Sequence, residues 1–294
     1  MTRVRWWIKA LTPPIVLLGL RKLVPKRESP AIQAPPDPEP PEWEYVPEGW
    51  RRPVAGWNAA GVLAAYEAKW PAFLRALEGS GPLGVNHEAS LADIECAEDP
   101  AAQNLLVSFA YVLALAAGGR DRVSILDWGG GIGHYYVIAR AVLPEVAIDY
   151  TCRDLPILCA RGRDLFPEVS FVDDDSWLER SYDLVLASSS LHYSEDWRRT
   201  LAGLARSTSR YLYVTRVPLA SRSPSFVVLQ RAQRHGYGTD YLGWVLNRNE
   251  LLEAAGQSGL RLVREFLLDA QFDAAGAPER PTAHRGFLFR GTPG

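Results

Sequence analysis

The sequence predicts an α/β fold: a doubly wound, mainly parallel sheet of seven strands with helices on both faces, preceded by a helical extension. Apolar runs alternate with helical stretches from residue 121 to the end of the chain, which is the pattern of a parallel sheet. Glycines follow the first run directly, and acids follow the next runs. Because ligands bind outside the carboxyl ends of parallel strands, these positions predict a ligand site along that edge.

The composition narrows the class of protein. With 294 residues and 47% hydrophobic content, the chain can bury one α/β core and carry an N-terminal extension. A formal net charge of -2 gives no basic footprint for DNA or RNA, so no nucleic-acid partner is expected. The three cysteines lack Cys-x-x-Cys spacing, which predicts neither a disulfide framework nor a zinc site. We therefore expect no metal and a cytoplasmic location.

Residues 1–24 are expected to form a basic, apolar N-terminal helix. Arginines and lysines flank Trp6, Trp7 and the apolar run 15–20, but Pro13 and Pro14 interrupt it before the roughly 20 apolar residues that a bilayer span needs. Two interpretations stay open. The segment lies in an anionic membrane interface, which would make it a peripheral membrane contact, or it covers an apolar groove of the folded domain.

Two further segments precede the predicted sheet. Residues 25–57 are rich in proline, which favours an extended spacer, but Trp43, Tyr45, Trp50 and Trp57 suggest that this linker folds back over the domain. Residues 58–120 have helical spacing of apolar residues and include an almost wholly apolar helix over 101–117. Residues 121–294 then form the core.

The segment from Ile125 to Tyr136 is an apolar strand that ends in Asp127 and turns into a helix through a glycine loop. A dinucleotide-binding fold needs the spacing Gly-x-Gly-x-x-Gly, but counting from Gly129 the third glycine position is His134. A phosphate-cradling loop would end in Gly-Lys-Ser/Thr, and no lysine lies in this loop. The spacing therefore argues against an NAD-dependent oxidoreductase.

What remains is an Asp127-x-Gly129-x-Gly131-x-Gly133 loop, which resembles that of class I S-adenosylmethionine-dependent methyltransferases, a Rossmann-like family. More narrowly, Leu-Asp-Trp-Gly-Gly-Gly-Ile-Gly-His-Tyr-Tyr, Arg-Asp-Leu-Pro and Asn-Arg-Asn-Glu-Leu resemble a little-characterised bacterial group of methyltransferases. That group typically has phenylalanine where this chain has Trp128. The general resemblance covers about residues 101–291 and implies S-adenosylmethionine as the cofactor.

The resemblance assigns the glycine loop to that cofactor. A carboxylate at its mouth would repel a pyrophosphate but suits the ammonium and sulfonium charges of adenosylmethionine, and glycines let backbone N–H groups approach the ligand. Tyr136, in the following helix, either touches the methionine end or packs the helix. The implied cofactor residues of this segment are Asp127, Gly129, Gly130, Gly131, Gly133 and Tyr136.

The second strand, residues 146–152, is followed by Asp154 and Leu155. An acid at the carboxyl end of this strand, about twenty residues past the glycine loop, can accept both ribose hydroxyls of a nucleotide. A helix N-cap or a salt bridge to Arg153 would explain the same acid without a ligand.

The third and fourth strands supply the remaining cofactor candidates. Residues 169–172 run into Asp173-Asp174-Asp175-Ser176-Trp177, and in the resembled fold this corner holds the adenine. That implies Asp174 or Asp175 for the exocyclic amine and Trp177 for the ring face, although a solvated turn explains three acids equally well. The fourth strand, 182–188, ends at Ser188 and leads into Leu191 and His192, which resembles the family's motif beside the transferred methyl.

The last elements complete the predicted sheet. The fifth, sixth and seventh strands are expected over 210–216, 260–268 and 285–289, and a helix with an Asn cap over 249–255. Residues 218–247 are longer than a plain connection, so they face the substrate or extend the scaffold. In the resembled fold the lead-in 58–120 forms part of a substrate lid, where Asn86, His87 and Glu88 face a pocket or act as caps.

The sequence leaves the chemistry less defined than the cofactor. Methyl transfer depends mainly on positioning, but an alcohol acceptor must also lose a proton. His192 is the candidate base, because it follows the fourth strand and exchanges protons near neutral pH, and a structural histidine is the open alternative. His235 is the second candidate base. We expect methylation of a small-molecule or glycan acceptor at oxygen, and the rival is a non-catalytic binding or scaffold protein of the same fold.

Overall fold

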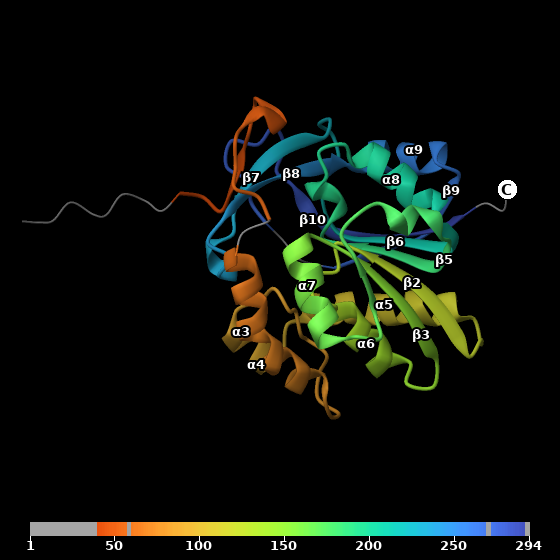
Figure 1. The fold of residues 1–294 in the computed structure, drawn as a ribbon. Helices are drawn as coiled ribbons and strands as arrows, with labels where there is room; N and C mark the ends of the chain where they lie inside the picture. The colour runs from red at the N-terminus through yellow and green to blue at the C-terminus, as the bar shows by residue number, and fades with distance from the viewer. Residues whose placement is uncertain (1–39, 58–59, 269–271, 292–294) are drawn as a thin grey trace, which may run out of the picture. The chain divides into compact units, whose positions relative to one another are not determined.

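The computed structural model describes residues 40–57, 60–268 and 272–291, and ten strands in these ranges form one mixed sheet (Figure 1). The predicted N-terminal helix over 1–24 lies outside the described residues. The central strands are, in spatial order, β4 (Ser170–Val172), β3 (Ala147–Arg153), β2 (Arg122–Trp128), β5 (Tyr182–Ser188), β6 (Thr208–Ala220), β10 (Thr282–Gly291) and β9 (Leu260–Leu267). The first five are mutually parallel, and β10 runs antiparallel to both β6 and β9.

The predicted seven-stranded, mainly parallel sheet is therefore the central part of a larger mixed sheet. Three further strands, which the sequence did not predict as strands, continue it: β1 (Trp43–Tyr45), β7 (Phe226–Arg231) and β8 (Asp240–Asn247). They pair antiparallel with one another, and β8 joins the end of β6 in parallel. The segment expected as a proline-rich linker thus contributes a strand, and the long connection 218–247 contains a hairpin.

Helices cover both faces of the sheet, as the doubly wound pattern requires (Figure 1). Their bounds are α3 (Ala60–Leu77), α4 (Leu91–Cys96), α5 (Pro100–Ala117), α6 (His134–Val142), α7 (Pro156–Leu165), α8 (Trp197–Arg206) and α9 (Arg248–Gln257). Side chains of α3, α5, α6 and α7 belong to one buried core, and those of α8 and α9 belong to the core on the opposite face. Short 3-10 helices lie at Gly49–Arg51, Ser176–Glu179, Leu191–Tyr193 and Gln233–His235.

Capping residues explain where two of these helices begin. The Asp99 side chain accepts from the Ala101 N–H and Pro100 occupies the first turn, so α5 starts there, and it ends at Gly118 in the left-handed conformation. In α9 the Asn247 side chain accepts from the N–H groups of Asn249 and Glu250, so this helix starts one residue before the predicted range. Asn247 is also the last residue of β8, so its cap joins α9 directly to the sheet.

Within the described ranges, α5 is the helix long and apolar enough to cross a bilayer. Half of its apolar stretch is buried, and it packs against β2, β5, β6 and α6. This packing identifies it as a core helix of the α/β domain.

The strand order places the ligand-binding edge. β2 and β5 are neighbours, and the connection that leaves β2 leads to β3 on one side while the connection that leaves β5 leads to β6 on the other, which defines a topological switch point. The loops that leave β2 and β5 meet here, because a Cβ added to Gly129 would overlap the Cβ of Ser190. Gly129 has a φ of +79°, so the turn needs glycine for both reasons.

We predict that Trp43→Ala lowers the free energy of unfolding by about 3 to 5 kcal/mol. The Trp43 side chain is 6% exposed and packs in a cluster with Phe226, Val228 and Val245, so its removal leaves a cavity under β1. Urea denaturation measures the effect, and Leu267→Ala, at a side chain 70% exposed, is the control. Equal stability of the two variants would contradict the contribution of β1 to the fold.

Candidate functional site

The glycine loop after β2 rests on the carboxyl group of Asp127. This side chain is completely buried, and its Oδ2 accepts a 2.5 Å hydrogen bond from the Tyr150 hydroxyl. A Cβ added to Gly130 would overlap Asp127 Oδ2 and lie 2.8 Å from Cys152 Sγ, so the loop can pack on the carboxyl group only without a side chain at Gly130. Burial raises the pKa of Asp127 to about 7, although the Tyr150 hydrogen bond favours the charged form.

For Asp127, the resemblance implies a carboxylate at the mouth of the loop, facing the cofactor. It lies beneath the loop and lines neither of the two cavities described below. The physical reason is the strand alternation: Asp127 belongs to β2 itself, where the side chain points into the layer between sheet and loop. We assign it the role of supporting the loop.

Asp154, at the carboxyl end of β3, holds the same loop from the side. Its Oδ2 accepts from the Gly131 N–H at 2.7 Å, and its Oδ1 accepts from the Leu155 N–H at 2.6 Å. The following helix α7 begins after Leu155, and Arg153 lies over the Trp128 ring at 5.7 Å. Asp154 thus joins two neighbouring strand ends, and its carboxylate stands where a ribose-binding acid was predicted.

A cavity opens between these strand ends, and we call it the strand-end cavity. Its volume is about 130 Å³. It is lined by Trp57, Trp128, Gly129, Arg153, Asp154, Leu155, Ser189, Ser190 and Tyr193. Three predicted cofactor residues, Gly129, Asp154 and Leu155, are therefore brought together here. Trp128, where the resembled group has phenylalanine, forms part of the wall.

Other predicted cofactor residues lie away from this cavity. The Tyr136 hydroxyl donates to Glu168 at 2.9 Å, on the side of α6 that faces Phe166. The Ser188 hydroxyl is hydrogen-bonded to the Tyr135 hydroxyl at 2.8 Å inside the core. Gly133 carries the N-terminal turn of α6, with a φ of +101°. These residues shape the loop and the helix behind it.

In the corner after β4, the three acids have the geometry of the solvated turn, one of the two alternatives that the sequence leaves open. Asp174 and Asp175 are exposed, and Asp174 Oδ1 accepts from the Ser176 N–H at 3.0 Å, as in a solvated turn. Trp177 is 5% exposed and packs in the core beneath α8, where a Cβ on Gly203 would lie 3.2 Å from its ring. The side chains of this corner do not line the strand-end cavity.

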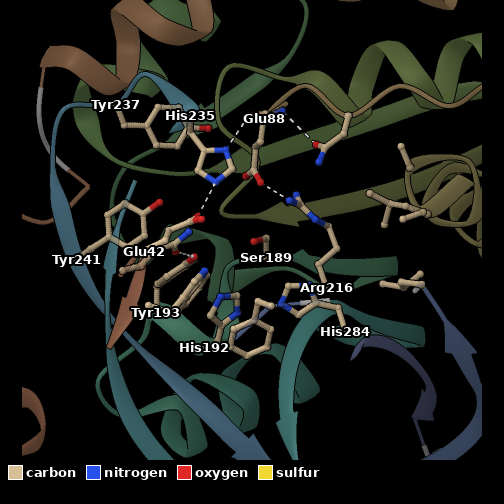
Figure 2. A pocket seen from close by; sticks show the side chains of 18 of the residues that line it. Glu42, Glu88, Ser189, His192, Tyr193, Arg216, His235, Tyr237, Tyr241 and His284 are labelled. Carbon is tan, nitrogen blue, oxygen red and sulfur yellow. Dashed lines mark hydrogen bonds and ion pairs between the residues drawn. The ribbon is translucent and has the colours of Figure 1, made fainter. Parts of the chain in front are cut away.

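A second, more polar cavity adjoins the first, and we call it the polar cavity (Figure 2). Its volume is about 200 Å³. Its polar lining comprises Glu42, Asn86, Glu88, Asp99, Ser189, His192, Arg216, Gln230, His235 and His284, and its aromatic lining includes Trp43, Trp57, Tyr193, Tyr237, Tyr241 and Phe272. Trp57, Ser189 and Tyr193 line both cavities and so form the wall between them.

A buried ion pair crosses the polar cavity. Arg216 Nη2 donates to Glu88 Oε2, and each side chain is 14% exposed. Burial raises the pKa of Glu88, but the charge and hydrogen bond of Arg216 outweigh it and hold that pKa below its usual value. Glu88 comes from the lead-in before α4 and Arg216 from β6, so the pair joins two distant parts of the chain (Figure 2).

Two residues of this cavity have unusual backbone conformations. Ser189 has a φ of +53° and Arg216 a φ of +58°, both in the left-handed region that costs a non-glycine residue free energy. Arg216 lies between Val214 and Val217, where the register between β6 and β10 shifts. Ser189 directly follows β5, and Arg216 directly follows Thr215, the last residue of β6 that pairs with β5, so both strained residues lie where this strand pairing ends.

All five histidines of the chain gather around this ion pair. His192, His235 and His284 line the cavity, and His87 and His134 stack on each other at 4.1 Å behind Glu88. His235 Nδ1 lies 3.0 Å from the Glu88 carbonyl oxygen and its Nε2 lies 3.6 Å from Glu42 Oε1. Within the described ranges, no group of three or more His, Cys, Asp or Glu side chains has a metal-binding arrangement.

His192, the predicted base, is 1% exposed and lines the polar cavity. Burial, the neighbouring His284 and the Arg216 charge together lower the pKa of His192 well below its usual value. Burial and Arg216 also lower the pKa of His284, to about 3. Both imidazoles are therefore neutral at pH 7 and are weak bases.

The sequence did not identify Arg216, His284, Glu42 or Gln230 as site residues. Arg216 had a detectable signal, since it is a charged residue at the carboxyl end of a predicted strand. Glu42 directly precedes β1, Gln230 lies in β7 and His284 in β10, and the pairing of these strands brings together residues far apart in the chain. No local pattern marks such residues.

In comparisons with known proteins, no protein-family model matches the chain, and no curated protein matches it. Among solved structures it is similar to a Burkholderia thailandensis 1,6-didemethyltoxoflavin-N1-methyltransferase with bound 1,6-didemethyltoxoflavin and S-adenosylhomocysteine, at 15% identity over 85% of this chain and 100% of that one, with a TM-score of 0.46.

Two other solved structures are similar to a comparable degree. An O-methyltransferase family protein from Burkholderia thailandensis has 17% identity, the alignment covers 79% of this chain and 70% of that protein, and the TM-score is 0.44. The cyclase SpnF has 17% identity, the alignment covers 66% of this chain and 83% of the cyclase, and the TM-score is 0.46. At these identities and TM-scores, the likeness assigns neither an activity nor a substrate.

We predict that Asp127→Asn changes the pH dependence of stability. Because the folded-state pKa of Asp127 is raised above its unfolded value, the folded chain favours the protonated form, and stability falls as pH rises from about 4 towards 7. Asparagine stays neutral at both pH values. Between pH 5 and pH 8 the wild type should therefore lose about 2 to 3 kcal/mol relative to the variant.

Urea denaturation at the two pH values measures this difference. The exposed Asp164→Asn variant is the control and should follow the wild type. If the stability difference between Asp127→Asn and the wild type is the same at pH 5 and pH 8, the buried carboxyl group does not behave as described.

Proposed function

We propose that this protein is an S-adenosylmethionine-dependent methyltransferase that modifies a small-molecule or glycan acceptor at oxygen. The observation that best supports this function is the meeting of two cavities at the switch point. One contains a strand-end acid beside a glycine loop, and the other contains a buried arginine among imidazoles. A shared wall of Trp57, Ser189 and Tyr193 separates them, so a donor and an acceptor would meet there.

The donor set of the strand-end cavity fits the cofactor. Asp154 offers two carboxylate oxygens at the carboxyl end of β3, where they can accept the ribose hydroxyls. Gly129 and Ser190 bring the backbone of two loops together without intervening bulk. When bound, adenosylmethionine supplies a methyl group on a cationic sulfur, and the Asp154 carboxylate adds a favourable charge nearby.

The size of the cavity requires a rearrangement on binding. Ligand pockets typically measure about 300 to 1,000 Å³, and the strand-end cavity measures about 130 Å³. Trp57 and Tyr193 belong to its wall, with ring centroids 5.0 Å apart, so their outward movement would widen it towards the polar cavity. Asp154 would also exchange its bond to Gly131 for ribose hydroxyls.

The residues of the polar cavity would position the acceptor and exclude water. The Tyr193 hydroxyl donates to Gln230 Oε1 at 2.7 Å, which fixes the ring at the shared wall. Tyr241 stacks on Trp57 with centroids 4.1 Å apart, which closes the aromatic side of the cavity. Such positioning supplies most of the rate enhancement in methyl transfer.

A non-catalytic binding protein of the same fold is the alternative function. The narrow strand-end cavity and the weak basicity of His192 favour it. The cytoplasmic location and the peripheral membrane contact through residues 1–24 remain proposals from the sequence.

Calorimetric titration with adenosylmethionine, S-adenosylhomocysteine and NAD tests the proposed function. We expect the first two to bind and NAD not to bind. Asp154→Ala should weaken cofactor binding by about 1 to 3 kcal/mol, because a hydrogen-bonding carboxylate is lost. Asp164→Ala, at an exposed position of α7, is the matched control and should bind like the wild type. If neither adenosyl compound binds, the protein is not such an enzyme.

A further inference from the structure

We propose that the methyl acceptor is a small phenol or enol that binds in the polar cavity as its oxyanion, against the guanidinium group of Arg216. The identification of this molecule as the methyl acceptor rests on the proposed function. The binding of an oxyanion at Arg216 does not depend on the proposed function. The proposal therefore predicts an acceptor with an acidic hydroxyl group and not one with the aliphatic hydroxyl groups of a glycan.

The first argument is the hydrogen bonding of Arg216. It is the one lysine or arginine among the described residues that line the polar cavity. A guanidinium group has five N–H donors, and Arg216 uses Nη2 to reach Glu88 (Figure 2). Among residues 40–57, 60–268 and 272–291, no further hydrogen bond from this guanidinium group is seen, and the side chain keeps 14% of its surface exposed at the cavity. Arg216 therefore has donors left for an oxygen atom of a ligand.

The second argument is how firmly Arg216 is held. Glu88 anchors one side of the guanidinium group, and the left-handed backbone of Arg216 directs the side chain across the cavity. Lys69 Nζ in turn donates to the carbonyl oxygens of Glu88 (3.2 Å) and His235 (2.7 Å), which fixes the segment carrying Glu88. A donor fixed in advance stabilises a developing or bound anion better than a mobile one.

The charges around Arg216 determine how an anion can bind. The carboxylates that line the polar cavity are Glu42, Glu88 and Asp99; Glu88 pairs with Arg216, and Glu42 lies by His235. Glu88 balances Arg216 in the free protein, so an anionic ligand competes with Glu88 for the guanidinium group. His192 and His284 lie beside Arg216 and are neutral, so each can add an N–H donor without adding charge (Figure 2).

The third argument is that His192 and His284 do not suit the deprotonation of an aliphatic alcohol. Such an alcohol needs a strong base to lose its proton, and the histidines beside Arg216 are weak bases because burial and the arginine charge disfavour their protonation. A phenol has a pKa of about 10, far below that of an aliphatic alcohol, so it can give its proton to water as the oxyanion binds, without a strong base in the protein. The Arg216 charge then favours the ionised form.

The shape of the cavity fits a small planar acceptor. Its volume of about 200 Å³ lies below the roughly 300 Å³ at which pockets for drug-sized ligands begin. The rings of Trp57, Tyr193 and Tyr241 form one wall. In the transfer, the oxyanion would supply the electron pair of the new O–C bond, and the electron pair of the broken S–C bond would stay on sulfur, which leaves as a neutral thioether.

The test uses 4-nitrophenol, because its anion absorbs visible light and its pKa lies near neutrality. We expect the wild type to bind it as the anion and to lower its pKa by about 1 to 3, as measured by absorbance titration with saturating protein. Glu88→Gln frees Arg216 from its partner, so binding of the anion should become tighter. Glu88→Gln combined with Arg216→Met replaces both charges without leaving one buried alone, and the pKa of the probe should then return to its free value.

Controls make each outcome decisive. Arg261→Gln changes an exposed arginine of β9 and should bind 4-nitrophenol like the wild type. A purely structural ion pair predicts that Glu88→Gln and the double variant both weaken binding, and that result overturns the proposal. Absence of binding to the wild type, or binding of the neutral form, overturns it as well. Binding of the nitrophenolate with no binding of adenosylmethionine would keep the oxyanion site and reject the methyltransferase.

Discussion

Two buried carboxyl groups hold the glycine loop against the sheet, and the candidate site depends on this arrangement. Asp127 lies beneath Gly130, where no side chain fits, and Asp154 accepts from the Gly131 N–H. Both acids are buried, and burial raises the pKa of each above its usual value. The loop is therefore fixed by groups that are costly to bury, which is reasonable where a sharp turn has to leave a strand end open for a ligand.

The polar cavity is built differently, by contacts over long sequence distances. Glu88 precedes α4 and Arg216 ends the regular part of β6, and their buried ion pair joins the lead-in to the sheet. Such a pair contributes little net stability, because the desolvation of both charges offsets their attraction. Its clearer effect is geometric, since it holds one cation at a defined place among neutral imidazoles and aromatic rings.

Local sequence patterns were sufficient to predict the central strands of the sheet, but not the three strands β1, β7 and β8 that extend it. Strands buried on both faces appear as apolar runs, and the fourth predicted strand, 182–188, has the bounds of β5. β1 has three residues in a proline-rich segment, which gives too short a pattern to detect. β7 and β8 contain apolar residues, but no turn signal clear enough to predict a hairpin separates them, so the pattern of 218–247 predicts one long connection.

The same distinction applies to the candidate site. Asp154 and Gly129 could be predicted because they belong to a motif contiguous with strand ends. The positions of Trp177 and Tyr136 could not, because both side chains are apolar enough to belong to a core and only packing decides which way they point. The five histidines come from five separate parts of the chain, namely the loop before α4, the start of α6, two 3-10 helices and β10, so no spacing in the sequence indicates that they cluster.

A crystal structure of the complex with S-adenosylhomocysteine tests the central claim most directly. The account predicts the ribose on the Asp154 carboxylate, the Gly131 N–H released from it, and the sulfur at the wall of Trp57, Ser189 and Tyr193. A complex in which Asp154 keeps its bond to Gly131 and the nucleoside lies elsewhere would contradict it.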